Sequence, residues 1–231
     1  MVAILGANSV SGGYEVSDSL RFNDDDSPFL QFTPSGDGNK RTFTYSVWFK
    51  RANLTGAEQY LLEVNESADD NDNFRIIITS AEKLTIQDTE SNSSNLDLRL
   101  DQVFRDVSAW YHLVVSIDTT QSTNTNRAKV YVNGNQVTSF STSNYPSQNY
   151  DTNVNTASEP FAIAKRNSGG SASHFDGYMT EINFVDGSQL TPTSFGEFDD
   201  NGVWIPKKYT GSYGTNGFFL QFKQTGTSTR V

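Results

Sequence analysis

The chain has 231 residues, and its 17 lysine and arginine residues against 27 aspartate and glutamate residues give a formal net charge of −10. It contains no cysteine and two histidines, which excludes a disulfide scaffold, a thiolate metal site and a zinc centre made of three histidines. The negative charge argues against a protein that binds along nucleic-acid phosphates. No apolar run is long enough to span a bilayer or to form a secretory signal. The sequence therefore predicts no nucleic-acid partner, no membrane insertion and no secretion by a signal peptide.

Residues 1–15 show no regular alternation of apolar and polar side chains, so we expect an N-terminal arm there. Residues 16–231 are expected to form one domain, because all-β sandwiches run to roughly 200–250 residues. Within this domain, the aromatic and glycine-rich segment 199–231 is expected to add a last strand and a tail that covers part of the surface.

Short segments with an apolar residue at every second position follow in chain order. Segments 43–49 and 111–117 are the clearest, since a strand would align their apolar side chains on one face and a helix would scatter them. Further strands are predicted at 20–22, 29–32, 60–64, 74–79, 83–88, 96–100, 161–164, 178–185 and 217–222. The polar stretches 66–73, 89–95, 119–126, 141–157 and 166–173 are predicted to be loops.

Two hairpins are predicted from local chemistry. Segment 74–88 contains two apolar strands separated by a short polar turn. In the second hairpin, Asn133 and Gly134 supply the two residues with positive φ that a type I′ turn needs. Counting outward from that turn, Val130 should face Val137 across the two strands.

Helix signals are few. Segment 191–195 has a threonine in the N-cap position followed by a proline, which predicts one helical turn, and 101–109 is a second candidate. The sequence therefore predicts an all-β fold, with two antiparallel sheets stacked as a jelly-roll sandwich and at most one or two short helical turns.

Four of these segments resemble, in order and spacing, the conserved strands of laminin-G-like domains of the concanavalin A-like lectin/glucanase superfamily. The segments are 43–50, 110–118, 130–134 and 175–182. The likeness extends over residues 18–186 and implies a lectin-like sandwich. Thr180 stands where the family usually has an aspartate.

A narrower likeness covers nearly the whole chain. Segments 12–24, 184–198 and 202–218 resemble virion proteins of tailed bacteriophages, notably marine ones. This resemblance implies a tail-fibre, adhesin or capsid-decoration protein that is made in the host cytoplasm and carried on the virion. Its partners would be other virion proteins or a host-surface glycan, with assembly as a trimer or on a symmetric lattice.

The sequence predicts that the protein is not an enzyme. The strand with two facing glutamates that marks the related retaining glucanases is missing, and Glu181 has no second carboxylate two or four residues away. His112 lies in the middle of a strand, on the face it shares with Trp110, which favours a structural role. His174 lies in a loop of glycine and serine. A glycoside hydrolase is the least favoured alternative.

Calcium is the one cofactor that the acidic residues suggest, because it binds several oxygen ligands from loops. The candidate ligands fall in two clusters: Asp24, Asp25 and Asp26, and Asp69, Asp70 and Asp72. The second cluster does not fit the EF-hand pattern. A solvated acidic turn is the competing interpretation, and a stand-alone, calcium-assisted carbohydrate-binding module is the alternative function.

Sugar binding requires an aromatic ring beside polar groups that pair with hydroxyls. Tyr145, Asn149 and Tyr150 have this composition within the loop 141–157. Trp48, on the strand face opposite Phe43 and Tyr45, is expected on an open sheet surface. These four polar and aromatic residues are the predicted glycan-binding residues, although packing in the sandwich core could use the same aromatic side chains.

Overall fold

In the computed structural model, the described residues are 14–54, 56–65, 71–167 and 173–223. They form two seven-stranded sheets and a separate two-stranded one, and every strand pair is antiparallel. The strands are β1 (Leu20–Phe22), β2 (Leu30–Phe32), β3 (Thr42–Arg51), β4 (Gln59–Asn65), β5 (Asn73–Ile78), β6 (Lys83–Glu90), β7 (Ser93–Val103), β8 (Tyr111–Asp118), β9 (Ala128–Val132), β10 (Asn135–Gln136), β11 (Phe140–Asn144), β12 (Phe161–Ile163), β13 (Gly177–Asp186), β14 (Gly196–Phe198), β15 (Trp204–Pro206) and β16 (Phe218–Leu220).

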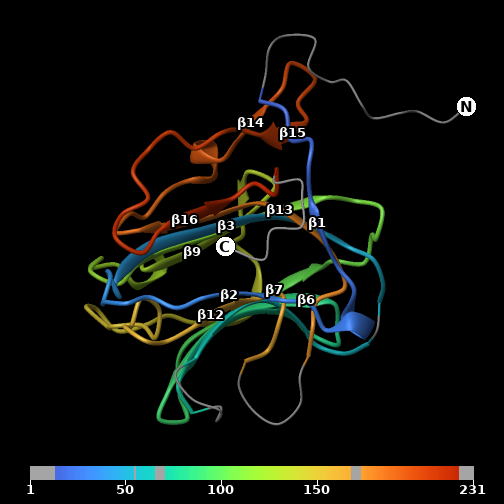
Figure 1. The fold of residues 1–231 in the computed structure, drawn as a ribbon. Helices are drawn as coiled ribbons and strands as arrows, with labels where there is room; N and C mark the ends of the chain where they lie inside the picture. The colour runs from blue at the N-terminus through green and yellow to red at the C-terminus, as the bar shows by residue number, and fades with distance from the viewer. Residues whose placement is uncertain (1–13, 55, 66–70, 168–172, 224–231) are drawn as a thin grey trace, which may run out of the picture.

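The first sheet has the strand order β1-β13-β3-β8-β9-β10, and β16 also pairs with β13. The second sheet has the order β11-β7-β6-β5-β4-β12-β2. Figure 1 shows the two layers stacked, with the β14–β15 hairpin standing on the outer side of the first sheet. The predicted jelly-roll sandwich is confirmed.

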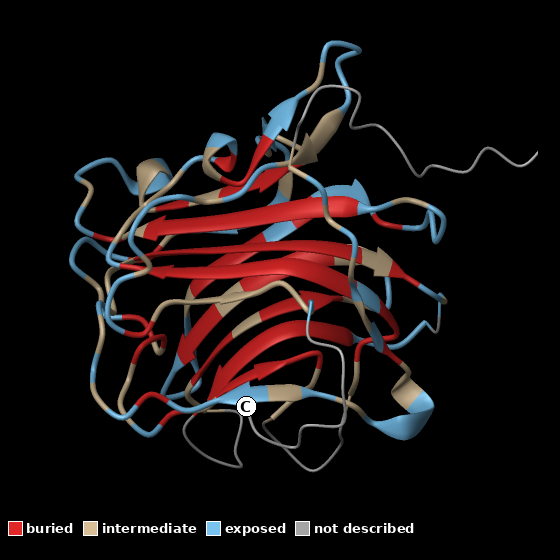
Figure 2. Ribbon diagram, turned by 45° about the horizontal axis from the view of Figure 1, so that its top comes forward, coloured by how far each residue is buried: buried red, intermediate tan, exposed pale blue. Residues whose placement is uncertain are grey.

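Aromatic side chains from both layers fill the space between the sheets. Phe43 of β3 meets Phe74 of β5 with ring centroids 5.6 Å apart, and Phe184 of β13 meets Phe161 of β12 at 4.9 Å. The inner strands are buried and the connecting segments are exposed (Figure 2). Burial of these apolar faces is the main stabilising contribution to the sandwich.

Both predicted hairpins are present. Strands β5 and β6 pair, and Asn133 and Gly134 have φ values of 47° and 80°. The Val137 N–H donates to the Val130 carbonyl at 2.8 Å, so these residues face each other. The helical turn predicted at 191–195 is the 3₁₀ turn η3 (Pro192–Ser194). The other helical segments among the described residues are two further 3₁₀ turns, η1 (Asp24–Asp26) and η2 (Asn124–Asn126).

Three local predictions are wrong. The predicted loop 89–95 is mostly strand, because β6 continues to Glu90 and β7 begins at Ser93. No helix forms over 101–109, because β7 continues to Val103 and the next residue is held by tertiary contacts: Phe104 N–H donates to the Glu82 carbonyl, and Arg51 donates to the Phe104 carbonyl. The predicted loop 141–157 begins as strand β11, which pairs with β7 at the edge of the second sheet.

The segment after β13 covers part of the outer face of the first sheet. Phe195 packs there on a small second core of Val114, Tyr131 and Val185, with Tyr209 and Tyr213 beside it. Strand β16 falls within the predicted last strand, 217–222. Of the predicted arm 1–15, residues 1–13 lie outside the described residues.

Candidate functional site

The three tryptophans of the chain lie around the outer face of the first sheet. Trp48 on β3 is paired in register with His112 on β8, and their rings stack with centroids 4.7 Å apart. Trp204, from β15, donates its indole N–H to His112 Nδ1 at 2.9 Å. Trp110 immediately precedes β8 and is 37% exposed.

His112 is fully buried, and its Nε2 atom lies 2.9 Å from Ser46 Oγ. Since Nδ1 accepts from Trp204, the ring proton resides on Nε2, which donates to Ser46. Burial lowers the pKa of His112 to about 3, so the ring is neutral at physiological pH. The structural role predicted for this histidine agrees with these contacts.

A cleft of about 350 Å³ opens beside this aromatic group. Its lining residues come from the N-terminal segment, the sheet face and the end of β15: Val16, Ser17, Asp18, Ser19, Trp48, Trp110, Thr180 and Pro206. His112 covers one face of the Trp48 ring, and Thr180 is the register partner of Trp48 on the opposite side. The other face of the Trp48 ring therefore lies on the Thr180 side, where both residues line the cleft.

The wall made by residues 16–19 is fastened to β13. Thr180 Oγ1 donates to the Asp18 carbonyl at 2.7 Å. Just before the wall, the Tyr14 hydroxyl donates to Glu181 Oε2 at 2.8 Å and accepts from Gln221. Glu181 lies in an irregularity of the β13–β3 register with φ of 49°, and burial raises its pKa. It joins the N-terminal segment to β13.

The cleft combines the groups that sugar recognition needs. Two indole rings provide apolar surface on which the C–H face of a pyranose can lie, and three hydroxyls and one carboxylate provide hydrogen-bonding groups. Its volume is within the range of small-molecule sites, which begins at about 300 Å³.

The four predicted glycan-binding residues lie in three separate places. Trp48 lines the cleft but is only 7% exposed, so the open surface predicted around it is wrong: His112 stacks on it within the sheet. Tyr145 packs against the core and lines a hollow of about 180 Å³ between β9 and β11. Asn149 and Tyr150 lie at the loop end of the sandwich.

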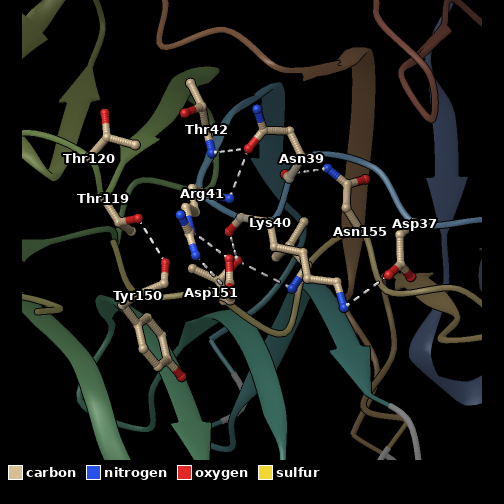
Figure 3. Close-up of polar contacts among 12 residues, drawn as sticks. Asp37, Asn39, Lys40, Arg41, Thr42, Thr119, Thr120, Tyr150, Asp151 and Asn155 are labelled. Atoms are coloured by element: carbon tan, nitrogen blue, oxygen red, sulfur yellow. Dashed lines mark hydrogen bonds and ion pairs between the residues drawn. The ribbon is translucent and has the colours of Figure 1, made fainter. Parts of the chain in front are cut away.

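The loop end is a network of polar contacts between segments 37–42 and 149–155 (Figure 3). Arg41 forms a bidentate ion pair with Asp151, at 2.7 and 3.1 Å. Asn155 donates to the Asn39 carbonyl at 2.8 Å, and Thr119 donates through its hydroxyl to the Tyr150 carbonyl at 2.7 Å. These side chains therefore hold the loops together through contacts within the protein.

Tyr150 is anchored rather than presented to solvent. Its hydroxyl donates to Asp88 Oδ1 at 2.6 Å and accepts from Asn95. Asp88 also accepts from the N–H and the side-chain amide of Asn153. Burial raises the pKa of Asp88 to about 7, although these hydrogen bonds act in the opposite direction. Asn149 is exposed and has φ of 61°, so it forms part of the turn before Tyr150.

The calcium prediction finds no support in the described part of the chain, where no group of three or more histidine, aspartate or glutamate side chains could hold a metal ion. Asp24, Asp25 and Asp26 form the turn η1, in which Asp26 accepts from Asn23. Asp72 accepts from the Ser91 N–H. Asp69 and Asp70 lie outside the described residues.

Sequence reasoning missed Asp18, Pro206 and the role of Trp110. One signal was present, since alternation puts Trp110 on the same strand face as His112. What brings these residues together is the order β1-β13-β3-β8, which places Thr180, Trp48 and His112 side by side.

This sandwich is the architecture of lectin-like domains, and sequence comparison gives the same class. A laminin G family model, described as the concanavalin A-like lectin/glucanases superfamily, matches residues 24–194. The chain belongs to this superfamily. The search of curated proteins returns no match. No helix in the described part of the chain is long and apolar enough to cross a membrane.

Several solved structures share the fold at low sequence identity. Domain 4 of AbnA, an extracellular arabinanase from Geobacillus stearothermophilus solved with arabinotriose, is 17% identical, with a TM-score of 0.53 over 76% of this chain and 73% of that one. A native heptameric SAP-like pentraxin from Limulus polyphemus is 17% identical, with a TM-score of 0.50 over 78% and 75%. Domains LG4-5 of mouse laminin α1 are 16% identical, with a TM-score of 0.50 over 80% of this chain and 47% of that one.

Proposed function

We propose that this domain is a non-enzymatic, lectin-like module that binds carbohydrate in the cleft between Trp48 and Trp110. The observation that carries the proposal is the cleft itself, in which indole rings, hydroxyls and a carboxylate meet in a volume of about 350 Å³. The arabinotriose bound to the arabinanase domain is consistent with a carbohydrate ligand on this fold.

Trp110 offers the cleanest test, because Trp48 also stacks on His112 and its loss would disturb the sheet. We expect Trp110→Ala to weaken glycan binding about fivefold or more, since an aromatic–sugar contact removed from water contributes on the order of 1 kcal/mol or more. Binding is measured on a glycan array and then by titration calorimetry. Phe29→Ala is the matched control, because Phe29 is 41% exposed, similar to Trp110, and does not line the cleft.

Equal binding by Trp110→Ala and the wild-type protein would contradict the proposed site. Binding that instead disappears in Tyr145→Ala, with the fold intact, would place the glycan at the hollow between β9 and β11.

The non-catalytic part of the proposal is supported by the position of Glu181. Its carboxylate is buried and accepts from Tyr14. Incubation of the protein with the glycan that it binds should release no reducing sugar. Release that is lost in Glu181→Gln would contradict this part of the proposal and restore the glycoside hydrolase.

The context that we propose is a phage virion, as a tail-fibre, adhesin or capsid-decoration protein. Its support is the resemblance of segments 12–24, 184–198 and 202–218 to virion proteins of tailed bacteriophages. The module would hold a host-surface glycan or another virion protein and assemble as a trimer or on a lattice. Electron microscopy of labelled particles should show the protein on the virion. A label absent from every part of the particle would favour a stand-alone carbohydrate-binding module.

A further inference from the structure

We infer that the cleft selects neutral sugars and rejects acidic ones, and that Asp18 determines this preference. The inference rests on the proposed carbohydrate-binding function and adds the class of ligand. Its first observation is the charge of the lining: among the eight described residues that line the cleft, Asp18 carries the one formal charge. Recognition of a sugar carboxylate normally uses an arginine or lysine, and the lining contains neither.

Two basic side chains near the cleft are already engaged. Arg21 pairs with the carboxylate of Asp176 and lies over the Tyr178 ring, 5.3 Å from its centroid. Lys207, which follows Pro206 in the chain, lies 3.3 Å from the Glu197 carboxylate. Neither cation is available without breaking an ion pair.

Lys50 is a third cation on this side of the sheet. It lies two residues after Trp48 on β3, so alternation directs it to the same face, but it does not line the cleft. Hydrogen bonds from Ser108, and then the charge of Lys50, lower the pKa of Asp106. The positive charge of Lys50 therefore already interacts with the Asp106 carboxylate.

Asp18 is held in position by its neighbours. Its carboxylate Oδ2 accepts from the Ser17 hydroxyl at 2.6 Å, and its carbonyl accepts from Thr180. A carboxylate can only accept hydrogen bonds, so it suits the O–H donors of a neutral sugar. A uronic or sialic acid would bring a second carboxylate beside it, in a protein whose net charge is −10. At contact distance, salt screens this repulsion little, since the Debye length is about 8 Å at physiological ionic strength.

The test uses pairs of glycans in which one terminal hexose is replaced by its uronic acid. We expect the wild-type protein to bind the neutral member about tenfold more tightly than the acidic member. Asp18→Asn keeps an acceptor for Ser17 and removes the charge, so this preference should fall to about twofold or less. Glu15→Gln is the matched control, because it removes one exposed negative charge of the same segment outside the lining and should leave the preference unchanged.

Further outcomes separate this inference from the proposed function. Wild-type protein that binds the acidic member as tightly as the neutral one, or an unchanged preference in Asp18→Asn with an unchanged melting temperature, overturns the neutral-sugar inference alone. Wild-type protein that binds no glycan of either kind overturns the proposed function and this inference with it. Acidic-sugar binding that is lost in Lys50→Gln would assign the selection to Lys50 instead.

Discussion

At the scale of single residues, His112 shows how hydrogen bonds and burial keep a titratable side chain in one protonation state. Trp204 donates to one ring nitrogen and Ser46 accepts from the other, so the neutral ring satisfies both neighbours. Protonation would place two donors opposite each other at Nδ1. The hydrogen bonds and the burial therefore favour the same charge state.

This arrangement predicts the titration of the two histidines of the chain. In the folded protein, the His112 ring should remain neutral, with its proton on Nε2, down to about pH 4, because burial lowers its pKa to about 3. His174 is only partly buried, and burial together with Lys165 lowers its pKa. ¹⁵N–¹H NMR of the rings during an acid titration should show His174 charging first. A His112 ring that charges near pH 6.5 would contradict the hydrogen-bond assignment.

Arg51 gives a second prediction at the residue scale. Its guanidinium is fully buried, forms an ion pair with Glu82 and donates to the Phe104 carbonyl at 2.8 Å. Arg51→Gln should lower the free energy of unfolding by about 3–5 kcal/mol, because it leaves the charge of Glu82 buried without its partner. The measurement is urea denaturation. Arg41→Gln, which breaks the exposed pair with Asp151, is the control and should cost much less. Equal losses in both variants would be evidence against the buried pair.

At the scale of secondary-structure elements, the hairpin β9–β10 and the two-stranded β14–β15 sheet are fitted to each other through Trp204. A Cβ atom on Gly134, in the β9–β10 turn, would lie 2.5 Å from the Trp204 ring, and one on Gly196 would lie equally close on β14. The indole therefore occupies a space that two glycines leave open. Gly134 therefore has two roles: it adopts the positive φ that the turn requires, and it leaves room for the Trp204 ring.

This fit predicts a difference between two glycine variants. Gly134→Ala should destabilise the fold by about 2–4 kcal/mol, since it combines a positive φ of 80° with overlap on Trp204. Gly202→Ala has a similar φ of 76° but no atom within 4 Å, so it should cost only about 1 kcal/mol. Thermal denaturation of both variants gives the difference. In a Trp204→Ala background, the extra cost of Gly134→Ala should disappear, and its persistence would show that the Trp204 contact is not its cause.

The elements also show what the sequence could and could not predict. Alternation predicted β3 and β8, and Asn133-Gly134 predicted the hairpin, because these signals are local. The strand at 140–144 was missed because its polar residues pair at a sheet edge without an apolar face. The cleft was missed for a different reason. It joins segments near residues 18, 48, 110, 180 and 206, and only the strand order brings them together.

At the scale of the whole molecule, the free energy of unfolding depends on pH through two buried groups, Asp88 and His112, and their contributions change with pH in opposite directions. The folded-state pKa of Asp88 is raised to about 7 from 3.8, so the folded protein binds more protons than the unfolded chain between these values. The contribution of Asp88 to stability therefore falls as the pH rises from about 4 to 7. The folded-state pKa of His112 is lowered from 6.5 to about 3, so its contribution is lost as the pH falls through this range.

Between about pH 4 and 6.5 the two dependences oppose each other, so the wild-type stability should change little with pH. Asp88→Asn removes the first dependence. Its free energy of unfolding, measured by urea denaturation, should rise by a few kcal/mol from pH 4 to 6.5, because one pKa unit corresponds to about 1.4 kcal/mol. Asp106→Asn is the control, since Asp106 is exposed and its pKa is not raised. If Asp88→Asn followed the pH profile of the wild-type protein, the buried carboxyl that anchors Tyr150 and Asn153 could not be the group that titrates near neutral pH.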